Sequence, residues 1–125
     1  MNKLRKILLV EDNEIDQIAT QYVIEEFDKN IDILIASDGE EALSILAACT
    51  EQPDVIFLDI NMPGMDGHMF LSEYSEKVTS AVVVVMLTSS EQKRDREKCE
   101  QYNFVRDYYV KPLEIEDLEK LSAAL

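Results

Sequence analysis

Short apolar runs alternate with helical patterns along this chain, and the alternation constrains the fold more than any other feature. The runs occupy residues 6–10, 31–36, 55–58, 81–87 and 104–110, and most are rich in β-branched side chains. Runs this short favour strands over buried helices. Because they are apolar at consecutive positions, we expect strands that are buried on both faces, as in a parallel sheet.

Apolar residues between these runs recur at spacings of three and four, which is the pattern of amphipathic helices. The first such segment follows Asn13, a residue type that often caps helices, and two others follow the turn at 37–39 and Gly67. The apolar members of the first segment are Ile15, Ile18, Ala19, Tyr22, Val23 and Phe27, and those of the last are Ile115, Leu118, Leu121 and Leu125. The order of elements is (βα)5, which predicts a doubly wound α/β domain with five parallel strands and right-handed crossovers.

The fourth predicted helix differs from the others. From Glu91 to Lys98 the sequence has no apolar residue, so only Cys99 and Tyr102 remain to anchor this helix. A helix with so little apolar surface to bury is held weakly. We therefore expect this segment to be mobile.

Length and charge narrow the classes of function. A chain of 125 residues is long enough for one domain with one core. Its net charge of −14 repels phosphate backbones and anionic lipids, which argues against nucleic-acid and membrane binding and leaves proteins, small ligands or cations as partners. Cys49 and Cys99 match no metal-ligand spacing and form no disulfide framework, so we expect reduced thiols in a cytoplasmic protein.

Polar side chains follow the predicted strands at the points where they end. The carboxyl ends of parallel strands lie on one edge of the sheet, and open α/β sheets bind ligands at this edge, near the point where the strand order reverses. The residues that meet there are Glu11 and Asp12 after the first strand, Asp59 after the third, Thr88 at the end of the fourth and Lys111 after the fifth. We therefore expect these residues to form one shallow site.

These residue types suit phosphoryl transfer. Three carboxylates in one place repel each other unless a cation joins them, and a site with only oxygen ligands favours Mg²⁺. Lys111 and Thr88 supply a positive charge and a hydroxyl for the oxygens of a phosphoryl group. Asp59 is the expected nucleophile, because carboxylates can form acyl phosphates.

Four motifs along the whole chain resemble the receiver domain of bacterial two-component response regulators. They are ILLVEDN at 7–13, VIFLDINMPGMDG at 55–67, MLTSS at 86–90 and YYVKP at 108–112. Each motif alone is weak, but all of them in this order are highly specific. The resemblance implies a flavodoxin-like sheet with the strand order 2-1-3-4-5.

The resemblance also implies roles for individual residues. Glu11 and Asp12 are the acidic metal pair, Asp59 is the phosphoacceptor and a metal ligand, and the backbone carbonyl of Asn61 is a further ligand. The implied metal is Mg²⁺, and no organic cofactor is implied.

The phosphoryl group and the signalling switch involve three further positions by this resemblance. Thr88 and Lys111 hold the phosphoryl group, and Lys111 and Pro112 match a peptide that is usually cis. Tyr108 stands at the position of an aromatic switch residue that turns inward when Thr88 moves toward the phosphate. Where the family commonly has a small Gly-Ala-like pair, this chain has Phe104 and Val105.

By this resemblance the chain is a phosphorylation-dependent switch and not a conventional enzyme. A histidine kinase or a histidine phosphotransfer protein supplies the phosphoryl group. A downstream protein reads the signal on the face formed by the fourth helix, fifth strand and fifth helix. We expect a cytoplasmic monomer or weak dimer, with a receiver domain over 1–125 and no output domain, which leaves a relay intermediate as an alternative.

Three other functions fit the sequence less well. A phosphatase of the haloacid-dehalogenase type needs a second acid two residues after its nucleophile, where this chain has Asn61 after Asp59. An FMN-binding flavodoxin is disfavoured because Glu11 and Asp12 repel a phosphate. A pseudo-receiver that carries no phosphate is expected to lack the nucleophile, the lysine or the metal acids, all of which are present. His68 is expected to be exposed, and nothing in the sequence indicates that it carries a phosphoryl group.

Overall fold

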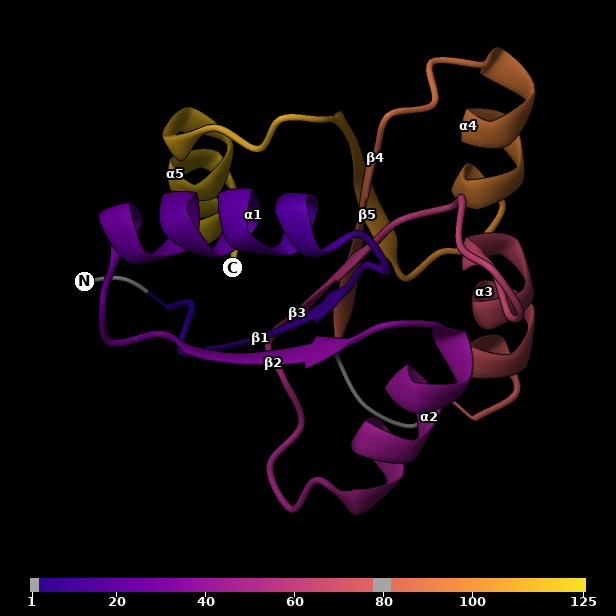
Figure 1. Cartoon of the computed structure of the whole chain (residues 1–125), viewed down its shortest axis with the longest axis horizontal. Coiled ribbons are helices and arrows are strands. Elements are labelled where there is room, and N and C mark those ends of the chain that lie inside the picture. Colours follow the sequence, from indigo (N-terminus) through magenta and orange to yellow (C-terminus); the bar gives the residue numbers. More distant parts are fainter. Residues whose placement is uncertain (1–2, 78–81) are drawn as a thin grey trace.

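A computed structural model describes residues 3–77 and 82–125, and it has five parallel strands with helices on both faces (Figure 1). Strands and helices alternate as predicted. They are β1 (Lys6–Val10), α1 (Glu14–Phe27), β2 (Asp32–Ala36), α2 (Gly39–Ala48), β3 (Val55–Leu58), α3 (Gly67–Ser75), β4 (Val83–Thr88), α4 (Lys93–Glu100), β5 (Val105–Val110) and α5 (Ile115–Ala124). Ala81, the first residue of the fourth apolar run, lies outside the described residues.

The strand order is β2-β1-β3-β4-β5 and every neighbouring pair is parallel, which confirms the predicted doubly wound sheet. α1 and α5 cover one face, and α2, α3 and α4 cover the other (Figure 1). From β1 the chain moves to β2 at one edge of the sheet, and it then returns to β3 on the opposite side of β1. The order in which strands are added therefore reverses between β1 and β3. The crevice at this switch point is where ligands bind in such sheets.

The sheet separates two apolar cores. Alternate residues of a strand point to opposite faces. Accordingly, Leu8 and Val10 belong to the core under α2 and α3, whereas Ile7 and Leu9 belong to the core under α1 and α5. Burial on both sides explains why the strands are apolar at consecutive positions.

The apolar residues of α1 lie on two faces of the helix. Val23 and Phe27 pack against the core, as expected for an amphipathic helix. Ile15, Ile18 and Tyr22 are 76%, 66% and 65% exposed, although their spacing also fits a core stripe. We call these three residues the α1 apolar patch. The prediction of a helix is confirmed, but four of the six apolar residues of its predicted stripe, these three and Ala19, are exposed.

α4 buries little apolar surface, as its sequence predicts. Cys99 is its buried residue, and burial raises the pKa of this thiol to about 12, so it stays protonated and unreactive. Just beyond the helix, the rings of Tyr102 and Phe104 lie 5.5 Å apart. The N-cap residue Gln92 makes no side-chain capping bond, unlike Asn13 at the start of α1. No helix in the described ranges is long and apolar enough to span a membrane.

Gly67 allows α3 to begin directly against the loop that follows β3. A Cβ atom there would lie 2.5 Å from the carbonyl oxygen of Asp59 and 2.7 Å from the Cα atom of Ile60. We expect Gly67→Ala to lower the free energy of unfolding by about 1–3 kcal/mol, because backbone must shift to make room. Urea denaturation measures this change.

Gly39→Ala is the matched control. A Cβ atom at Gly39 would meet chiefly the flexible side chain of Met65, with the Cγ atom at 2.6 Å. That side chain can move, so the loss of stability should be smaller. A larger loss for Gly39→Ala would contradict this view of the contact at Gly67.

Candidate functional site

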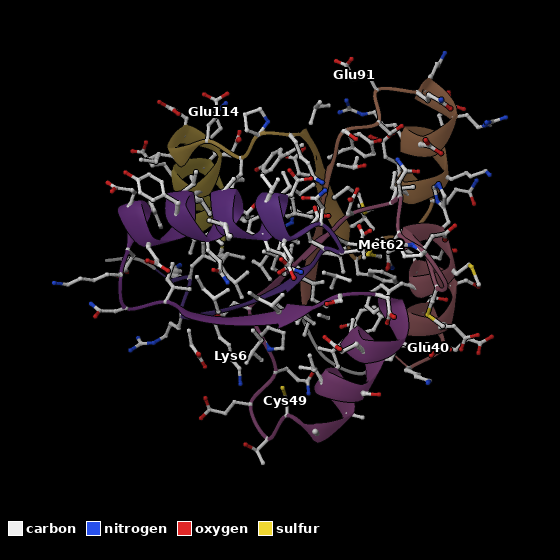
Figure 2. All side chains as sticks on the ribbon, in the orientation of Figure 1. Lys6, Glu40, Cys49, Met62, Glu91 and Glu114 are labelled. Atoms are coloured by element: carbon white, nitrogen blue, oxygen red, sulfur yellow. The ribbon has the colours of Figure 1, made fainter. Side chains whose placement is uncertain are left out.

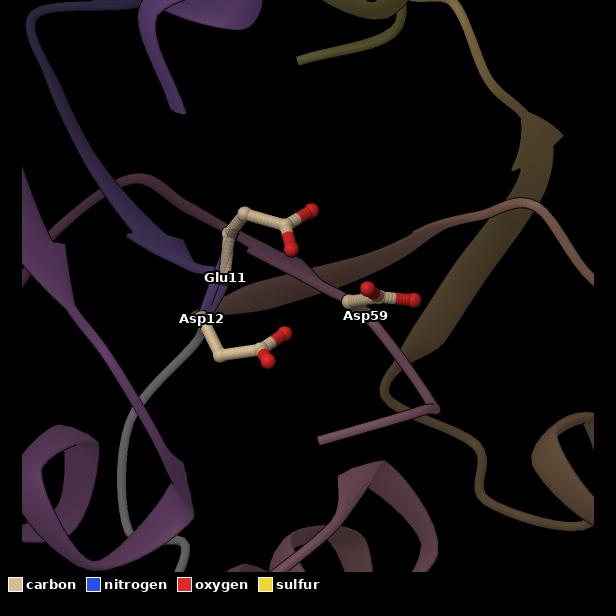
Figure 3. Close-up of side chains that lie close together, drawn as sticks. All are labelled: Glu11, Asp12 and Asp59. Atoms are coloured by element: carbon tan, nitrogen blue, oxygen red, sulfur yellow. The ribbon is translucent and has the colours of Figure 1, made fainter. Parts of the chain in front are cut away.

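Three carboxylates meet at the ends of two neighbouring strands. Glu11 and Asp12 follow β1, Asp59 follows β3, and Val10 pairs with Leu58 at the last position of the two strands. One oxygen from each carboxylate lies within 4.8 Å of the others, and Figure 3 shows the three side chains gathered at these strand ends. Glu11 and Asp59 are buried, whereas Asp12 is exposed. The predicted acidic cluster is therefore present.

Backbone hydrogen bonds fix the positions of the buried acids. The amide of Asp59 donates to the carbonyl of Val10 at 3.1 Å, which ties the two strand ends together. The amide of Ile60 donates to Asp59 Oδ1 at 2.8 Å, and the amide of Asn13 donates to Glu11 Oε2 at 3.1 Å. Both carboxylates are thus held by the chain segments that directly follow them.

Lys111 joins this cluster from the position directly after β5. Its own amide donates to the carbonyl of Thr88 at 2.9 Å, and the Lys111–Pro112 peptide is cis, as expected. The ammonium group contacts carboxylate oxygens of Glu11, of Asp16 at 2.9 Å and of Asp59 at 3.1 Å. Lys111 therefore lies beside Asp59, as the sequence predicts.

Asp16 was not predicted to belong to the site. It lies in the first turn of α1, five residues after Glu11, and its side chain is 40% exposed. A helix that begins at the end of a strand directs its first turn toward the same edge of the sheet. An acidic residue in the first turn of that helix is therefore a sequence signal that could have identified Asp16 as a candidate site residue.

Burial and charge shift the pKa values of the two groups that pair most closely. Burial raises the pKa of Glu11 to about 7, with the Asp59 charge adding to the rise and bonds from Lys111 and Asn13 opposing it. Burial lowers the pKa of Lys111, but its bonds to Glu11, Asp16 and Asp59 outweigh that effect and the net shift is upward. The buried carboxyl group of Glu11 therefore binds a proton more readily than usual, and a cation beside it would oppose this.

The residues fit a magnesium ion. All the cluster's donor atoms are carboxylate oxygens, the ligand type that Mg²⁺ prefers. Asp12, the exposed member, leaves one side of the cluster open to solvent. Asn61 lies two residues beyond Asp59 in an exposed part of the loop, and the role of its backbone carbonyl stays a prediction.

Thr88 and Tyr108 are both buried beside the loop between β4 and α4. Thr88 Oγ1 accepts a hydrogen bond from the amide of Ser90 at 3.3 Å, and the hydroxyl of Tyr108 donates to the Ser90 carbonyl at 2.9 Å. The guanidinium carbon of Arg96 lies 5.3 Å from the centre of the Tyr108 ring. The Tyr108 side chain is therefore buried in this structure, and its role as a switch stays a prediction, while Tyr109 packs on the opposite face.

His68 is not the exposed residue that the sequence suggested. Its side chain is 24% exposed, and Nε2 lies 3.0 Å from a carboxylate oxygen of Asp95 in α4. The hydroxyl of Ser90 donates to the other oxygen at 2.6 Å, and these bonds, that of Ser90 first, lower the pKa of Asp95. This His68–Asp95–Ser90 network attaches α4 to α3 and to the loop after β4.

Comparison with known proteins finds a family model, similar sequences and similar folds. Residues 7–123 match the family model described as response regulator receiver domain. PilH of Pseudomonas aeruginosa is 29% identical over 94% of this chain and 93% of its own length. The crystal structure of a two-component response regulator from Cytophaga hutchinsonii has a TM-score of 0.87 at 28% identity, covering 98% of this chain and 96% of that one. The Mn²⁺-bound form of response regulator Rcp1 has a TM-score of 0.76 at 28% identity, covering 96% and 90%.

Some relatives are much longer than this chain. A protein-glutamate methylesterase/protein-glutamine glutaminase of Hahella chejuensis is 39% identical over 71% of this chain, yet the chain spans only 24% of that protein. The similarity to it therefore concerns the shared receiver region and not the activity in its name.

Mg²⁺ binding tests the acidic cluster. We expect Asp12→Ala to weaken binding by more than about tenfold, because it removes one carboxylate of the cluster. Lys111→Ala should not weaken it, because this ammonium competes for oxygens of Glu11 and Asp59. Isothermal calorimetry measures both affinities. Glu14→Ala, the same change of charge at an exposed residue of α1, is the control, and equal losses in all three variants would contradict the assignment.

Proposed function

Because this chain belongs to the response regulator receiver domain family, we propose that it accepts a phosphoryl group on Asp59 in the presence of Mg²⁺ and signals by contact with another protein. The observation that carries this proposal is the meeting of Asp59 with two further acids and Lys111 at the switch point of the sheet. Family membership makes the chain a component of phosphorylation-dependent signalling. The residue-level roles are the proposal.

Asp59 is the proposed nucleophile. Its buried carboxylate is held between the Ile60 amide and the Lys111 ammonium, so one oxygen on each side is oriented before the reaction. The new bond joins phosphorus to a carboxylate oxygen of Asp59. The bond from phosphorus to the donor breaks, and its electron pair stays on the donor atom, which is a histidine nitrogen in a protein donor.

The surrounding residues stabilise the transferred group. Glu11, Asp12, Asp59 and the carbonyl of Asn61 are the proposed Mg²⁺ ligands, and the ion supplies positive charge for the phosphoryl oxygens. Lys111 supplies a second positive charge. Thr88 Oγ1 already accepts a bond from Ser90, so its own proton is available to donate to a phosphoryl oxygen.

The chain is proposed to catalyse only its own phosphorylation and dephosphorylation. Receiver domains are signalling domains and generally not conventional enzymes. A phosphatase of the haloacid-dehalogenase type is disfavoured because Asn61 stands where a second acid is needed. A cytoplasmic location agrees with this role in the family.

The α1 apolar patch is the proposed docking surface for the protein that donates the phosphoryl group. Ile15, Ile18 and Tyr22 are exposed on the helix whose first turn carries Asp16, which contacts Lys111 in the site. A donor whose histidine reaches Asp59 must approach this edge of the sheet. The acidic residues Glu14, Glu25 and Glu26 of the same helix are exposed, so a donor helix with apolar residues flanked by basic ones complements this surface.

The downstream protein is proposed to bind the face formed by α4, β5 and α5. Ser90 contacts both Thr88 at the site and Asp95 in α4, so a movement of Thr88 toward a phosphoryl group alters the attachment of this helix. Glu91 lies at the outer rim of the molecule, at the loop that leads into α4 (Figure 2). The helix is held by little buried surface, and such elements change position at low cost.

Acetyl phosphate with Mg²⁺ should add one phosphoryl group to the wild-type chain. Intact-mass spectrometry detects the addition. Asp59→Asn should reduce labelling by at least about a hundredfold, because the amide is not a nucleophile, and EDTA should abolish labelling of the wild type. Asp32→Asn, a loss of charge at an exposed acid at the start of β2, is the control. Undiminished labelling of Asp59→Asn would refute the proposed phosphoacceptor.

Ile18→Ser should slow phosphotransfer from a protein donor by about tenfold, because it removes apolar contact area from the docking surface. Phosphorylated histidine kinases and phosphotransfer proteins are first compared as donors to the wild-type chain, and the one that reacts fastest is used in the assay. Labelling by acetyl phosphate should be unchanged. Met69→Ser, at an exposed apolar residue of α3, is the control, and equal slowing by this variant would place the docking surface elsewhere.

A further inference from the structure

The ammonium group of Lys111 has three acceptors from three different elements. They are Glu11 after β1, Asp59 after β3 and Asp16 in α1, and the lysine side chain is only 15% exposed. An ammonium group has three N–H donors, so each of them is used. The side chain of Asp16 is the most exposed of the three acids.

Two of these acceptors also belong to the proposed magnesium site. Glu11 and Asp59 contribute oxygens to the acidic cluster, whereas Asp16 lies outside it. A cation held by that cluster repels the ammonium and binds two of the carboxylates that the ammonium now contacts. Of the three carboxylates that contact Lys111, Asp16 is then the one that does not also bind the cation.

Lys111 needs a partner such as Asp16 to stay beside Asp59. A lysine is a point charge on a flexible stem, and it takes up one position only when its partners hold it there. Beside the stem, Asp16, Val23 and Leu113 line a cavity of about 100 Å³ together with Ala19, Thr20 and Pro112. This space gives the stem an alternative position away from Asp59.

We propose that Asp16 is a positioning residue that keeps the Lys111 ammonium over Asp59 when Glu11 and Asp59 bind a cation. Through this contact α1 takes part in the chemistry, although none of its residues touches the transferred group. The inference rests on the proposed phosphorylation of Asp59, and the test separates the two.

The test compares Asp16→Ala with Asp16→Asn, which keeps an oxygen acceptor in the same place. At saturating Mg²⁺, the initial rate of Asp59 labelling by acetyl phosphate should fall about tenfold in Asp16→Ala and by less than about threefold in Asp16→Asn. A role limited to the charge at the start of α1 would affect both variants equally. Glu14→Ala is the matched control, because it removes the same charge from the same turn.

A double-mutant cycle with Lys111→Ala shows whether Asp16 acts through the lysine. In that background Asp16→Ala should change the labelling rate by less than about twofold. Calorimetry supplies a readout that needs no reaction. Asp16→Ala should weaken Mg²⁺ binding about threefold when Lys111 is present, because the lysine then has only the two cluster acids as acceptors, and it should have no effect in Lys111→Ala.

The outcomes distinguish the inference from the proposed function. A wild-type chain that is never labelled on Asp59 refutes the proposed function, and the Mg²⁺ titrations still test the contact between Asp16 and Lys111. Wild-type rates in Asp16→Ala, equal losses in the alanine and asparagine variants, or an undiminished effect in the Lys111→Ala background each overturn the positioning role.

Discussion

The site depends on one balance of charge, in which the ammonium of Lys111 is shared by carboxylates from three parts of the chain. Two of those carboxylates are buried, and without a positive charge between them they would repel each other or take up protons. The lysine thus neutralises part of the negative charge of the acids that a metal ion is proposed to bind. The proposed ion and the lysine therefore compete for the carboxylates of Glu11 and Asp59.

The sheet determines where this balance is located. All five strands run in one direction, and the three central strands β1, β3 and β4 are buried almost throughout, so charged groups have little place along their length. Only the strand ends, where the chain turns toward solvent, can carry them. The hydrogen bonds from the Asp59 amide to the Val10 carbonyl and from the Lys111 amide to the Thr88 carbonyl hold these ends in register.

Much of this arrangement follows from local sequence. Run length and β-branching identify the strands, and parallel topology alone brings Asp59 to Glu11 and Lys111. Topology says nothing of which face of a helix meets the core. Ile15, Ile18 and Tyr22 have core-like spacing and are exposed. The contacts of Asp16 and His68 join residues 95 and 27 positions apart. The place of Asp16 in the first turn of α1 indicates the edge of the sheet that it faces, but no local pattern identifies Lys111 or Asp95 as the partner.

The attachment of α4 has a consequence for how such a protein diversifies. A helix held through Cys99 and through the network of His68, Asp95 and Ser90 contributes little to the free energy of folding. Its outward residues can be replaced while the sheet and the strand-end acids are preserved. The choice of partner can therefore change through substitutions on this helix, independently of the phosphorylation chemistry. Duplicated copies of such a gene can then acquire separate partners without first acquiring a new fold.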